Sequence, residues 1–353
     1  MRIAQVAPLA ESVPPKRYGG TERVVSWLTE ELVAQGHQVT LFASADSVTS
    51  AELVACAPQG LRLAGFRDFI ASHIVMLDQV WRRADDFDII HFHTDLLQFA
   101  TFQELSHKCI TTLHGRLDLP DFMPVFDAFP QMPLVSISRT QRTPLTPFVN
   151  WLANIHHGLP PRLCPYSPLG GDYLAFLGRI SPEKRPDRAI ENATRAGVPL
   201  RIAAKVDKVD QPYFEDVIRP LLDDPLIDFI GEIGDAEKPD FLGNALALLF
   251  PIDWPEPFGL VVIEAMATGT PVIAWPCGSV PEVVAHGVSG LIVDSIEEAV
   301  RAVETARRLG RTAVRAHFES RFTAARMARD YLGAYHRLFA APGARSPQLV
   351  AAE

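Results

Sequence analysis

Short apolar runs alternate regularly with amphipathic stretches along this chain, and this alternation restricts its possible folds more than any other feature. Strands are predicted in the first half at residues 3–8, 39–43, 89–93, 110–114, 134–138 and 151–156, with helices at 21–35 and 69–84. A second series of strands is predicted at residues 173–178, 200–204, 227–230, 247–251, 272–275 and 291–293, with helices at 185–196, 239–245, 258–268 and 296–308. Strands that alternate with helices in this way favour βα units in mostly parallel sheets.

A stretch rich in Pro and Gly at residues 158–172 separates the two series and is typical of a linker. We therefore expect an α/β protein of two Rossmann-like, doubly wound domains, at residues 1–160 and 172–317. Because the carboxyl ends of strands line the ligand crevice in open α/β sheets, both domains are expected to face one central cleft. A last helix at about residues 318–340 has no strand after it, and residues 341–353 are expected to form a disordered tail.

The composition excludes several classes of protein. Apolar residues make up 48% of the 353 residues and charged residues 21%, which excludes disordered, collagen-like and coiled-coil chains. The formal charge of −9 opposes binding to nucleic acids. The four cysteines lie far apart without a C-x-x-C motif, which fits a reducing compartment better than a zinc ribbon or a disulfide scaffold. The sequence shows neither a secretory signal nor a long apolar run, so we expect a cytoplasmic protein.

The strongest local signal is the segment of residues 254–267, in which Glu256 and Glu264 have seven residues between them. The proline after Glu256 favours the start of a helix, so Glu256 is expected in a loop and Glu264 two turns inside the helix. The amides expected at the helix N-terminus, where an anion can bind, are those of Phe258, Gly259 and Leu260. Carboxylates beside an anion site suit a ligand with many hydroxyl groups. The alternative is one solvated and one ordinary helical glutamate.

Two further stretches carry candidate binding groups. Arg179 and Lys184 follow a strand predicted to end at Gly178, and together they could neutralise a diphosphate without a metal. The alternative is a solvated loop with incidental charges. After the first strand, Gly19 and Gly20 form a flexible turn on which a phosphate or an acceptor could rest. A purely structural turn is the alternative there.

Together these three stretches resemble the retaining glycosyltransferases of family 4, which have the GT-B fold, and the resemblance extends over nearly the whole chain. In that family the nucleotide-sugar is held mainly by the C-terminal domain, and the last helix returns to the N-terminal one. The resemblance implies that Glu256 contacts the transferred sugar and Glu264 the ribose. It likewise implies that Arg179 and Lys184 hold the diphosphate, with Gly20 approaching from the opposite domain. The expected donor-binding residues are Gly19, Gly20, Glu232, Ile233, Phe258, Gly259, Leu260, Val261 and Glu264, with Glu232 and Ile233 near the base.

His114 ends a predicted strand and matches a family histidine near the reacting sugar, so it joins Glu256, Arg179 and Lys184 as a candidate catalytic residue. Many relatives have an aspartate after this histidine, whereas this chain has Gly115. A histidine buried in the core is the alternative.

Other residues raise the question of a metal site, and we expect none. His91 and His93 share one face of a predicted strand, and His156 and His157 are adjacent, but no H-E-x-x-H motif or cysteine accompanies them. We expect histidines at a strand edge that face the cleft. The only D-x-D motif, residues 86–88, precedes a strand and is expected to form a helix-to-strand turn.

Two surface features have both a structural and a functional interpretation. Residues 118–133 are rich in Pro, Phe and Met, and are expected to pack on the domain as a loop; the alternative is a lid that shapes the acceptor pocket. Arg2, Lys16, Arg17 and Arg23 could form a small basic patch for weak peripheral membrane contact, with a solvated face as the alternative.

The sequence therefore predicts a metal-independent transferase that moves a sugar from a nucleotide diphosphate sugar, such as a UDP- or GDP-sugar, to an acceptor hydroxyl with retention of configuration. The donor is a co-substrate, and no cofactor is expected. The acceptor is a sugar, a lipid or another small molecule. The alternatives are a nucleotide-sugar epimerase of the same fold, for which no acid–base set around the sugar is apparent, and a non-catalytic nucleotide-sugar-binding protein.

Overall fold

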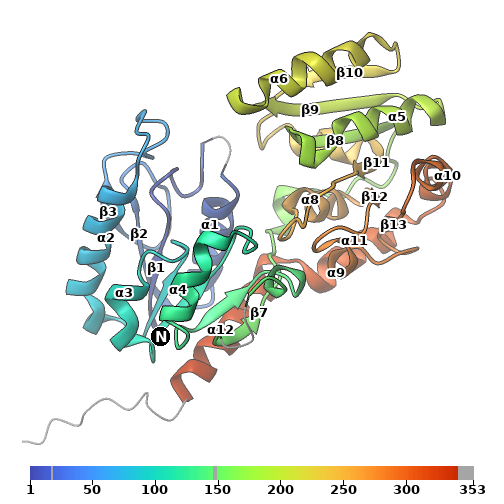
Figure 1. Ribbon diagram of the computed structural model, residues 1–353. Helices are drawn as coiled ribbons and strands as arrows, with labels where there is room; N and C mark the ends of the chain where they lie inside the picture. Colours follow the sequence, from blue (N-terminus) through green and yellow to red (C-terminus); the bar gives the residue numbers. More distant parts are fainter. Residues whose placement is uncertain (17–18, 146–148, 341–353) are drawn as a thin grey trace, which may run out of the picture. The chain divides into compact units, whose positions relative to one another are not determined.

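The computed structural model describes residues 1–16, 19–145 and 149–340, and Figure 1 shows its two sheets. All strand pairs in both sheets are parallel. The first sheet has the described strands in the spatial order β3 (Glu52–Ala57), β2 (Gln38–Ser44), β1 (Arg2–Val6), β4 (Ile89–Phe92), β5 (Cys109–Thr112), β6 (Leu134–Ser136) and β7 (Trp151–Asn154). The second has the order β10 (Ile227–Gly231), β9 (Leu200–Val206), β8 (Tyr173–Ile180), β11 (Ala245–Phe250), β12 (Val272–Ala274) and β13 (Gly290–Ile292). The predicted fold class is confirmed.

The helices connect these strands, as βα units require. The described helices before β8 are α1 (Gly20–Ala34), α2 (Ile70–Arg82), α3 (Phe99–Phe102) and α4 (Met123–Ala128). Those after β8 are α5 (Pro186–Ala196), α6 (Gln211–Tyr213), α7 (Lys238–Gly243), α8 (Leu260–Thr268), α9 (Val280–Val283), α10 (Ile296–Ala306), α11 (Arg311–Arg321) and α12 (Ala324–Ala340). No helix in these described ranges is long and apolar enough to cross a membrane.

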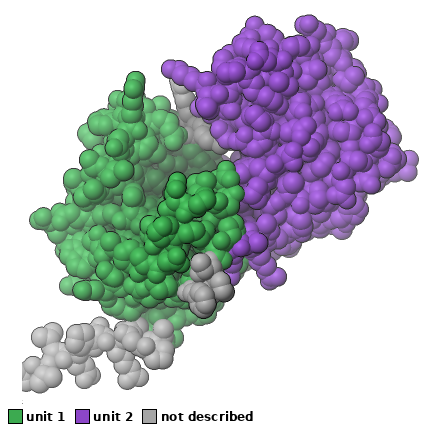
Figure 2. Space-filling view, in the orientation of Figure 1, with its two compact units in different colours: residues 1–137, 144–155, 327–353 green, residues 138–143, 156–326 purple. Residues whose placement is uncertain are grey.

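The chain forms two compact units (Figure 2). Unit 1 comprises residues 1–137, 144–155 and those from 327 onward, and unit 2 comprises residues 138–143 and 156–326. Each unit contains one sheet and its own apolar core. In unit 2, for example, β11 is buried along its whole length, as expected of a central strand covered on both faces. The predicted tail at 341–353, and Arg17 of the predicted basic patch, lie outside the described residues.

The strand β3 was missing from the sequence-based prediction. It lies at the edge of the first sheet and pairs only with β2 among the described strands. Most of its residues are exposed or half-buried, and its sequence is rich in small residues. An edge strand of this kind lacks the long apolar run by which the central strands were recognised.

The last helix, predicted at about residues 318–340, begins later than predicted because the chain breaks before it. α11 ends at Arg321 and α12 begins at Ala324, and between them the chain is extended beside Leu159. The amide of Leu159 donates to the carbonyl oxygen of Phe322 at 2.9 Å, and the amide of Ala324 donates to the carbonyl oxygen of Leu159 at 3.0 Å. These two hydrogen bonds replace helical ones. The helical spacing of apolar residues continues across the break, so the sequence pattern does not reveal that the helix is interrupted.

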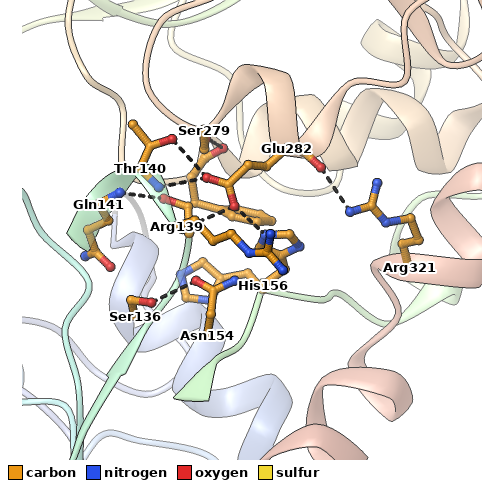
Figure 3. A network of polar contacts seen from close by, with 12 residues as sticks. Ser136, Arg139, Thr140, Gln141, Asn154, His156, Ser279, Glu282 and Arg321 are labelled. Carbon is orange, nitrogen blue, oxygen red and sulfur yellow. Dashed lines mark hydrogen bonds and ion pairs between the residues drawn. The ribbon is translucent and has the colours of Figure 1, made fainter. Parts of the chain in front are cut away.

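A single carboxylate, that of Glu282 on α9, binds both chain segments that enter unit 2 from unit 1 (Figure 3). It accepts hydrogen bonds from the amides of Arg139 and Thr140, both at 2.8 Å, and from the Thr140 hydroxyl at 2.9 Å. In the second segment, His156 Nε2 lies 3.2 Å from the same carboxylate. Burial alone raises the pKa of Glu282, but the hydrogen bonds from His156, Arg139 and Thr140 outweigh it and lower the pKa to about 2.

The Glu282→Gln variant is expected to be less stable by about 2 kcal/mol at neutral pH, because hydrogen bonds to an ionised group are worth more than neutral ones. The depressed pKa means that the stabilisation is fully present above the ordinary pKa of 4.5 and is lost as the pH falls towards about 2. Urea unfolding at a series of pH values measures the difference between variant and wild type. That difference should shrink between pH 4.5 and 2.

Glu297→Gln is the matched control, because Glu297 is an exposed partner of Arg195. It is expected to change stability much less than Glu282→Gln does, because water and salt screen an exposed ion pair. A pH-independent loss of stability in Glu282→Gln would contradict the account.

Candidate active site

The strands β8 and β11 are neighbours in the second sheet, but their connections leave in opposite directions. β8 is followed by β9 on one side, and β11 is followed by β12 on the other. The loops beyond the carboxyl ends of two such strands diverge, and open α/β sheets bind ligands there. Lys184 follows β8 and Glu256 follows β11. The topology thus places two of the predicted catalytic residues at the same edge of one sheet.

Lys184 and Glu256 form an ion pair, Nζ to Oε2, and both side chains are mostly buried. The Lys184 ammonium also lies 5.1 Å from the ring centre of Trp254 and 5.8 Å from that of Phe250. These aromatic faces attract the ammonium and exclude water from the pair. The site therefore presents a positive group for anionic oxygens beside a carboxylate that accepts hydrogen bonds from hydroxyl groups.

Polar contacts hold the loop after β8 and the loop after β11 together. The amide of Asp253 donates to the carbonyl oxygen of Glu183 at 2.9 Å. The Arg185 guanidinium binds the carboxylates of Asp187 and Asp253, each at 2.9 Å, and these partners raise its pKa. Arg185 has a left-handed backbone with φ of 54°, a conformation that costs energy for a non-glycine residue. The bidentate contacts hold this turn and so orient Lys184.

The backbone of Glu256 rests on the loop that follows β12. Its carbonyl oxygen accepts a hydrogen bond from the amide of Ser279 at 3.0 Å, and the Ser279 hydroxyl donates to the carbonyl oxygen of Phe258 at 2.7 Å. Gly278 lies so close that a Cβ there would sit 2.3 Å from the Glu256 carbonyl oxygen, and its φ is 55°. Only glycine fits at position 278. Ser279 directly precedes α9. The residue that binds the Glu256 backbone is therefore continuous with the helix that carries Glu282.

The helix after Glu256 starts two residues later than predicted, at Leu260 instead of Phe258. Gly259 is the N-cap residue with φ of 81°, and the Phe258 side chain is buried against the ring of His157 at 4.9 Å. Leu260 and Val261 are the first two helical residues, where amides have no partner within the helix. The late start arises because glycine readily adopts the positive φ that precedes the helix.

Arg179 lies inside β8, which continues to Ile180, and not after a strand ending at Gly178 as predicted. Its guanidinium contacts three carboxylates: Glu183 at 3.3 Å, Asp207 at 3.6 Å and Asp210 at 3.9 Å. Burial raises the pKa of Asp210. Arg179 and Lys184 thus have different carboxylate partners.

Glu264 lies within α8 and is buried, with an exposed fraction of 7%. Lys238 of α7 contacts its carboxylate at 3.5 Å and that of Asp235 at 3.0 Å. Sequence reasoning missed Lys238, because contact with Glu264 depends on how α7 packs on α8. The predicted base-binding residues Glu232 and Ile233 follow the end of β10, where Glu232 is exposed.

In unit 1, Gly19 and Gly20 lie at the start of α1, as the N-cap and the first helical residue. The surroundings are acidic. A Cβ at Gly19 would lie 3.1 Å from the Glu22 carboxylate, and the nearby Glu11 is buried and bound to Arg62 at 2.9 Å. Burial raises the pKa of Glu22 above its ordinary value.

His114 follows β5 by two residues and is half-buried, and its Nδ1 atom is buried. The prediction that His91 and His93 face a cleft from a strand edge is wrong, since their exposed fractions are 0% and 1%. They lie on β4 and just after it, and the rings of Tyr331 and Tyr335 on α12 pack against His91 at 5.0 and 5.7 Å. Within the described ranges no group of three His, Cys, Asp or Glu residues is arranged to hold a metal ion.

The segment of residues 118–133 contains α4, and it packs on unit 1 through Phe126 and Met132, each 1% exposed. This agrees with the structural interpretation. Part of the segment also faces a cavity in unit 1 of about 180 Å³ beside His114. The lining residues are Asp95, Leu96, Leu113, Gly115, Arg116, Leu117, Leu119 and Phe122.

Two family models match overlapping parts of the chain. Residues 18–182 match glycosyltransferase family 4, and residues 167–316 match glycosyl transferases group 1. The D-inositol 3-phosphate glycosyltransferase of Mycolicibacterium smegmatis is 35% identical over 133 residues, which are 34% of this chain and 29% of that protein. The phosphatidyl-myo-inositol mannosyltransferase of the same organism is 27% identical over 319 residues, 83% of this chain and 81% of that protein. The chain spans less than half the length of the D-inositol 3-phosphate glycosyltransferases that it matches.

Solved structures agree on the fold. AviGT4, a glycosyltransferase involved in avilamycin A biosynthesis, has a TM-score of 0.72 at 24% identity, with 97% of this chain and 99% of that chain covered. Anabaena Alr3699/HepE in complex with UDP and glucose has a TM-score of 0.71 at 17% identity, with 96% and 100% covered. Since the two family matches together extend over residues 18–316, the chain belongs to the group 1 and family 4 glycosyltransferases and has the GT-B fold.

Proposed function

We propose that this chain transfers a sugar from a nucleotide diphosphate sugar to an acceptor hydroxyl, with retention of the anomeric configuration and without a metal ion. The observation that carries the proposal is the Lys184–Glu256 ion pair, which lies where the connections after β8 and β11 diverge. Glu264 and Lys238 lie on two helices of the same unit, α8 and α7. The names of the relatives support the class of reaction, since they include a mannosyltransferase and inositol phosphate glycosyltransferases. The complex of HepE with UDP and glucose supports a uridine nucleotide as one candidate donor.

The proposed mechanism assigns the leaving diphosphate to positive groups of unit 2. Lys184 and the first amides of α8 donate hydrogen bonds to the oxygens of the diphosphate, and Arg179 provides a second positive charge. The bond between C1 of the sugar and the diphosphate oxygen breaks, and a bond from C1 to the acceptor oxygen forms on the same face. The proton of the acceptor hydroxyl passes to the leaving phosphate oxygen. Positive groups that meet this developing charge lower the barrier.

The two glutamates have separate roles in this proposal. Glu264 is buried on a helix beside Lys238, and it accepts hydrogen bonds from the ribose, a part of the donor that does not react. Glu256 lies in the loop beside Lys184 and contacts the sugar, on which positive charge develops. Contacts that are equal in the ground state and the transition state affect binding, whereas contacts with the developing charge affect turnover.

The variants Glu264→Gln and Glu256→Gln should therefore differ in kind. Glu264→Gln is expected to weaken binding of the free nucleoside diphosphate about tenfold, the value of a hydrogen bond to a charged group. Glu256→Gln is expected to lower turnover by about 10²-fold or more and to leave that affinity nearly unchanged. Calorimetry with UDP, GDP and ADP, together with steady-state rates, separates the two effects. The reverse pattern would contradict the assignment.

Metal independence is tested with a chelator. If Lys184 and Arg179 neutralise the diphosphate, turnover in excess EDTA should equal turnover in untreated buffer within about twofold. Added Mg²⁺ or Mn²⁺ should not increase it. Loss of turnover in EDTA that Mn²⁺ restores would refute this part of the proposal.

A further inference from the structure

The cavity of about 180 Å³ in unit 1 lies beyond the carboxyl ends of β4 and β5. Engineered cavities of about 150 Å³ that are lined by Leu, Ile and Phe bind benzene, so a cavity of this size holds one six-membered ring. The apolar residues that line it are Leu96, Leu113, Leu117, Leu119 and Phe122. Leu113 and Leu117 are 1% and 5% exposed and belong to an apolar core cluster of unit 1. The wall is therefore part of the folded core and favours an apolar ring.

Two charged residues, Asp95 and Arg116, also line the cavity, and they differ in their partners. The Arg116 guanidinium binds Asp118 in a bidentate pair, Nε to Oδ1 and Nη2 to Oδ2, both at 2.6 Å. The Asp95 carboxylate has no hydrogen bond or ion pair with any residue in the part of the chain that the structure describes. Since Asp118 balances the charge of Arg116, the charge that remains at the wall is the negative charge of Asp95.

A buried glutamine holds the backbone of Asp95 in place. Asp95 has a left-handed backbone with φ of 52°, which few residues other than glycine, asparagine and aspartate adopt. The side-chain amide of Gln98, which is 0% exposed, donates to the carbonyl oxygen of Asp95 and to the Thr111 hydroxyl, both at 2.9 Å. Its oxygen accepts a hydrogen bond from the Thr94 hydroxyl at 2.7 Å. Because Thr111 belongs to β5, these contacts fix the loop after β4 to the neighbouring strand.

The surroundings of Asp95 favour a ligand with a positive charge. The residue is accessible to solvent, but the protein atoms around its carboxylate still raise its pKa above the ordinary value. A ligand that fills the cavity removes more water from this carboxylate. Burying a charge is costly unless the charge is paired, so a positive group on the ligand offsets the cost. An anionic ligand would add repulsion.

We propose that this cavity binds an apolar, ring-sized group that carries a protonated amine, with the ring against the leucines and the amine paired with Asp95. Under the proposed function, on which this assignment rests, the group belongs to the acceptor, and the acceptor hydroxyl is a further group of the same molecule. An acceptor with a phosphate or another anion at this position is disfavoured.

Three probes of similar size separate the effect of charge from that of the ring: benzylamine, benzyl alcohol and benzoate. Their dissociation constants for the full-length protein at neutral pH are measured by NMR titration of ¹³C-labelled leucine methyl groups, which also report where the probe binds. The wild type is expected to bind benzylamine about tenfold more tightly than benzyl alcohol, the value of a hydrogen bond to a charged group. Benzoate should bind more weakly than either.

The Asp95→Asn variant removes the charge and keeps the shape of the side chain. It should bind benzylamine and benzyl alcohol equally within about twofold. Asparagine also adopts the left-handed conformation, so the variant is expected to fold. Asp127→Asn is the matched control, because Asp127 is an exposed residue of α4 that does not line the cavity, and it should keep the wild-type preference. Leu119→Trp fills the cavity and should weaken binding of both probes.

The assignment to the acceptor has a separate readout. In a transfer assay, benzylamine should raise the KM for the acceptor and leave the KM for the nucleotide-sugar unchanged, because it occupies the place of the acceptor only. An increase in the KM for the nucleotide-sugar alone would contradict the assignment.

The inference and the proposed function fail separately. Equal affinity of the wild type for benzylamine and benzyl alcohol overturns the inference even if the chain is an active transferase. A preference for benzylamine that Asp95→Asn retains also overturns it. If Asp95→Asn does not fold, the order of the three probes in the wild type alone decides. Absence of sugar transfer together with the expected order refutes only the proposed function.

Discussion

The reversal of strand order in each sheet is the constraint on which the site depends. In the second sheet the connections change direction between β8 and β11, and in the first they change between β1 and β4. Backbone pairing cannot fill the space where two loops diverge, so side chains at the carboxyl ends of those strands remain accessible to a ligand. Lys184 and Glu256 occupy that position in unit 2, and Gly20 follows the corresponding strand β1 in unit 1. The position of the candidate catalytic residues in unit 2 thus follows from the order of the strands.

Ion pairs hold the candidate site of unit 2 in place. Lys184 is bound to Glu256, Lys238 to Glu264, and Arg179 to a separate group of three carboxylates. A cation that is already oriented and partly desolvated needs little reorganisation to meet the charge of a leaving diphosphate. The same pairing prevents the positive groups from repelling one another in the folded protein.

The fold and the sites were predictable from the sequence to different degrees. Central strands such as β11 are continuous apolar runs, and Glu256 and Glu264 lie in a distinctive local motif, so single-sequence patterns identify both. The break between α11 and α12 was not predictable, because it depends on Leu159, a residue far away in the chain. Lys238 and Glu282 were not predicted for the same reason, because only tertiary packing brings them to their partners. His91 and His93 were placed wrongly because a polar residue in a strand suggests an exposed edge. In the structure, hydrogen bonds with Thr112 and Gln5 inside the core satisfy the two rings.

The most direct test of the central claim is a thermal-shift titration with UDP, GDP and ADP in the wild type, Lys184→Ala and Lys108→Ala. A ligand that binds the folded state raises the unfolding midpoint by mass action. Lys108 is a suitable control, because it is about as buried as Lys184 but lies before β5 in unit 1 and contacts Asp85. We predict that at least one nucleotide raises the midpoint of the wild type and of Lys108→Ala, and that Lys184→Ala loses most of this rise. An undiminished rise in Lys184→Ala, or no rise in the wild type with any of the three nucleotides, would contradict the claim.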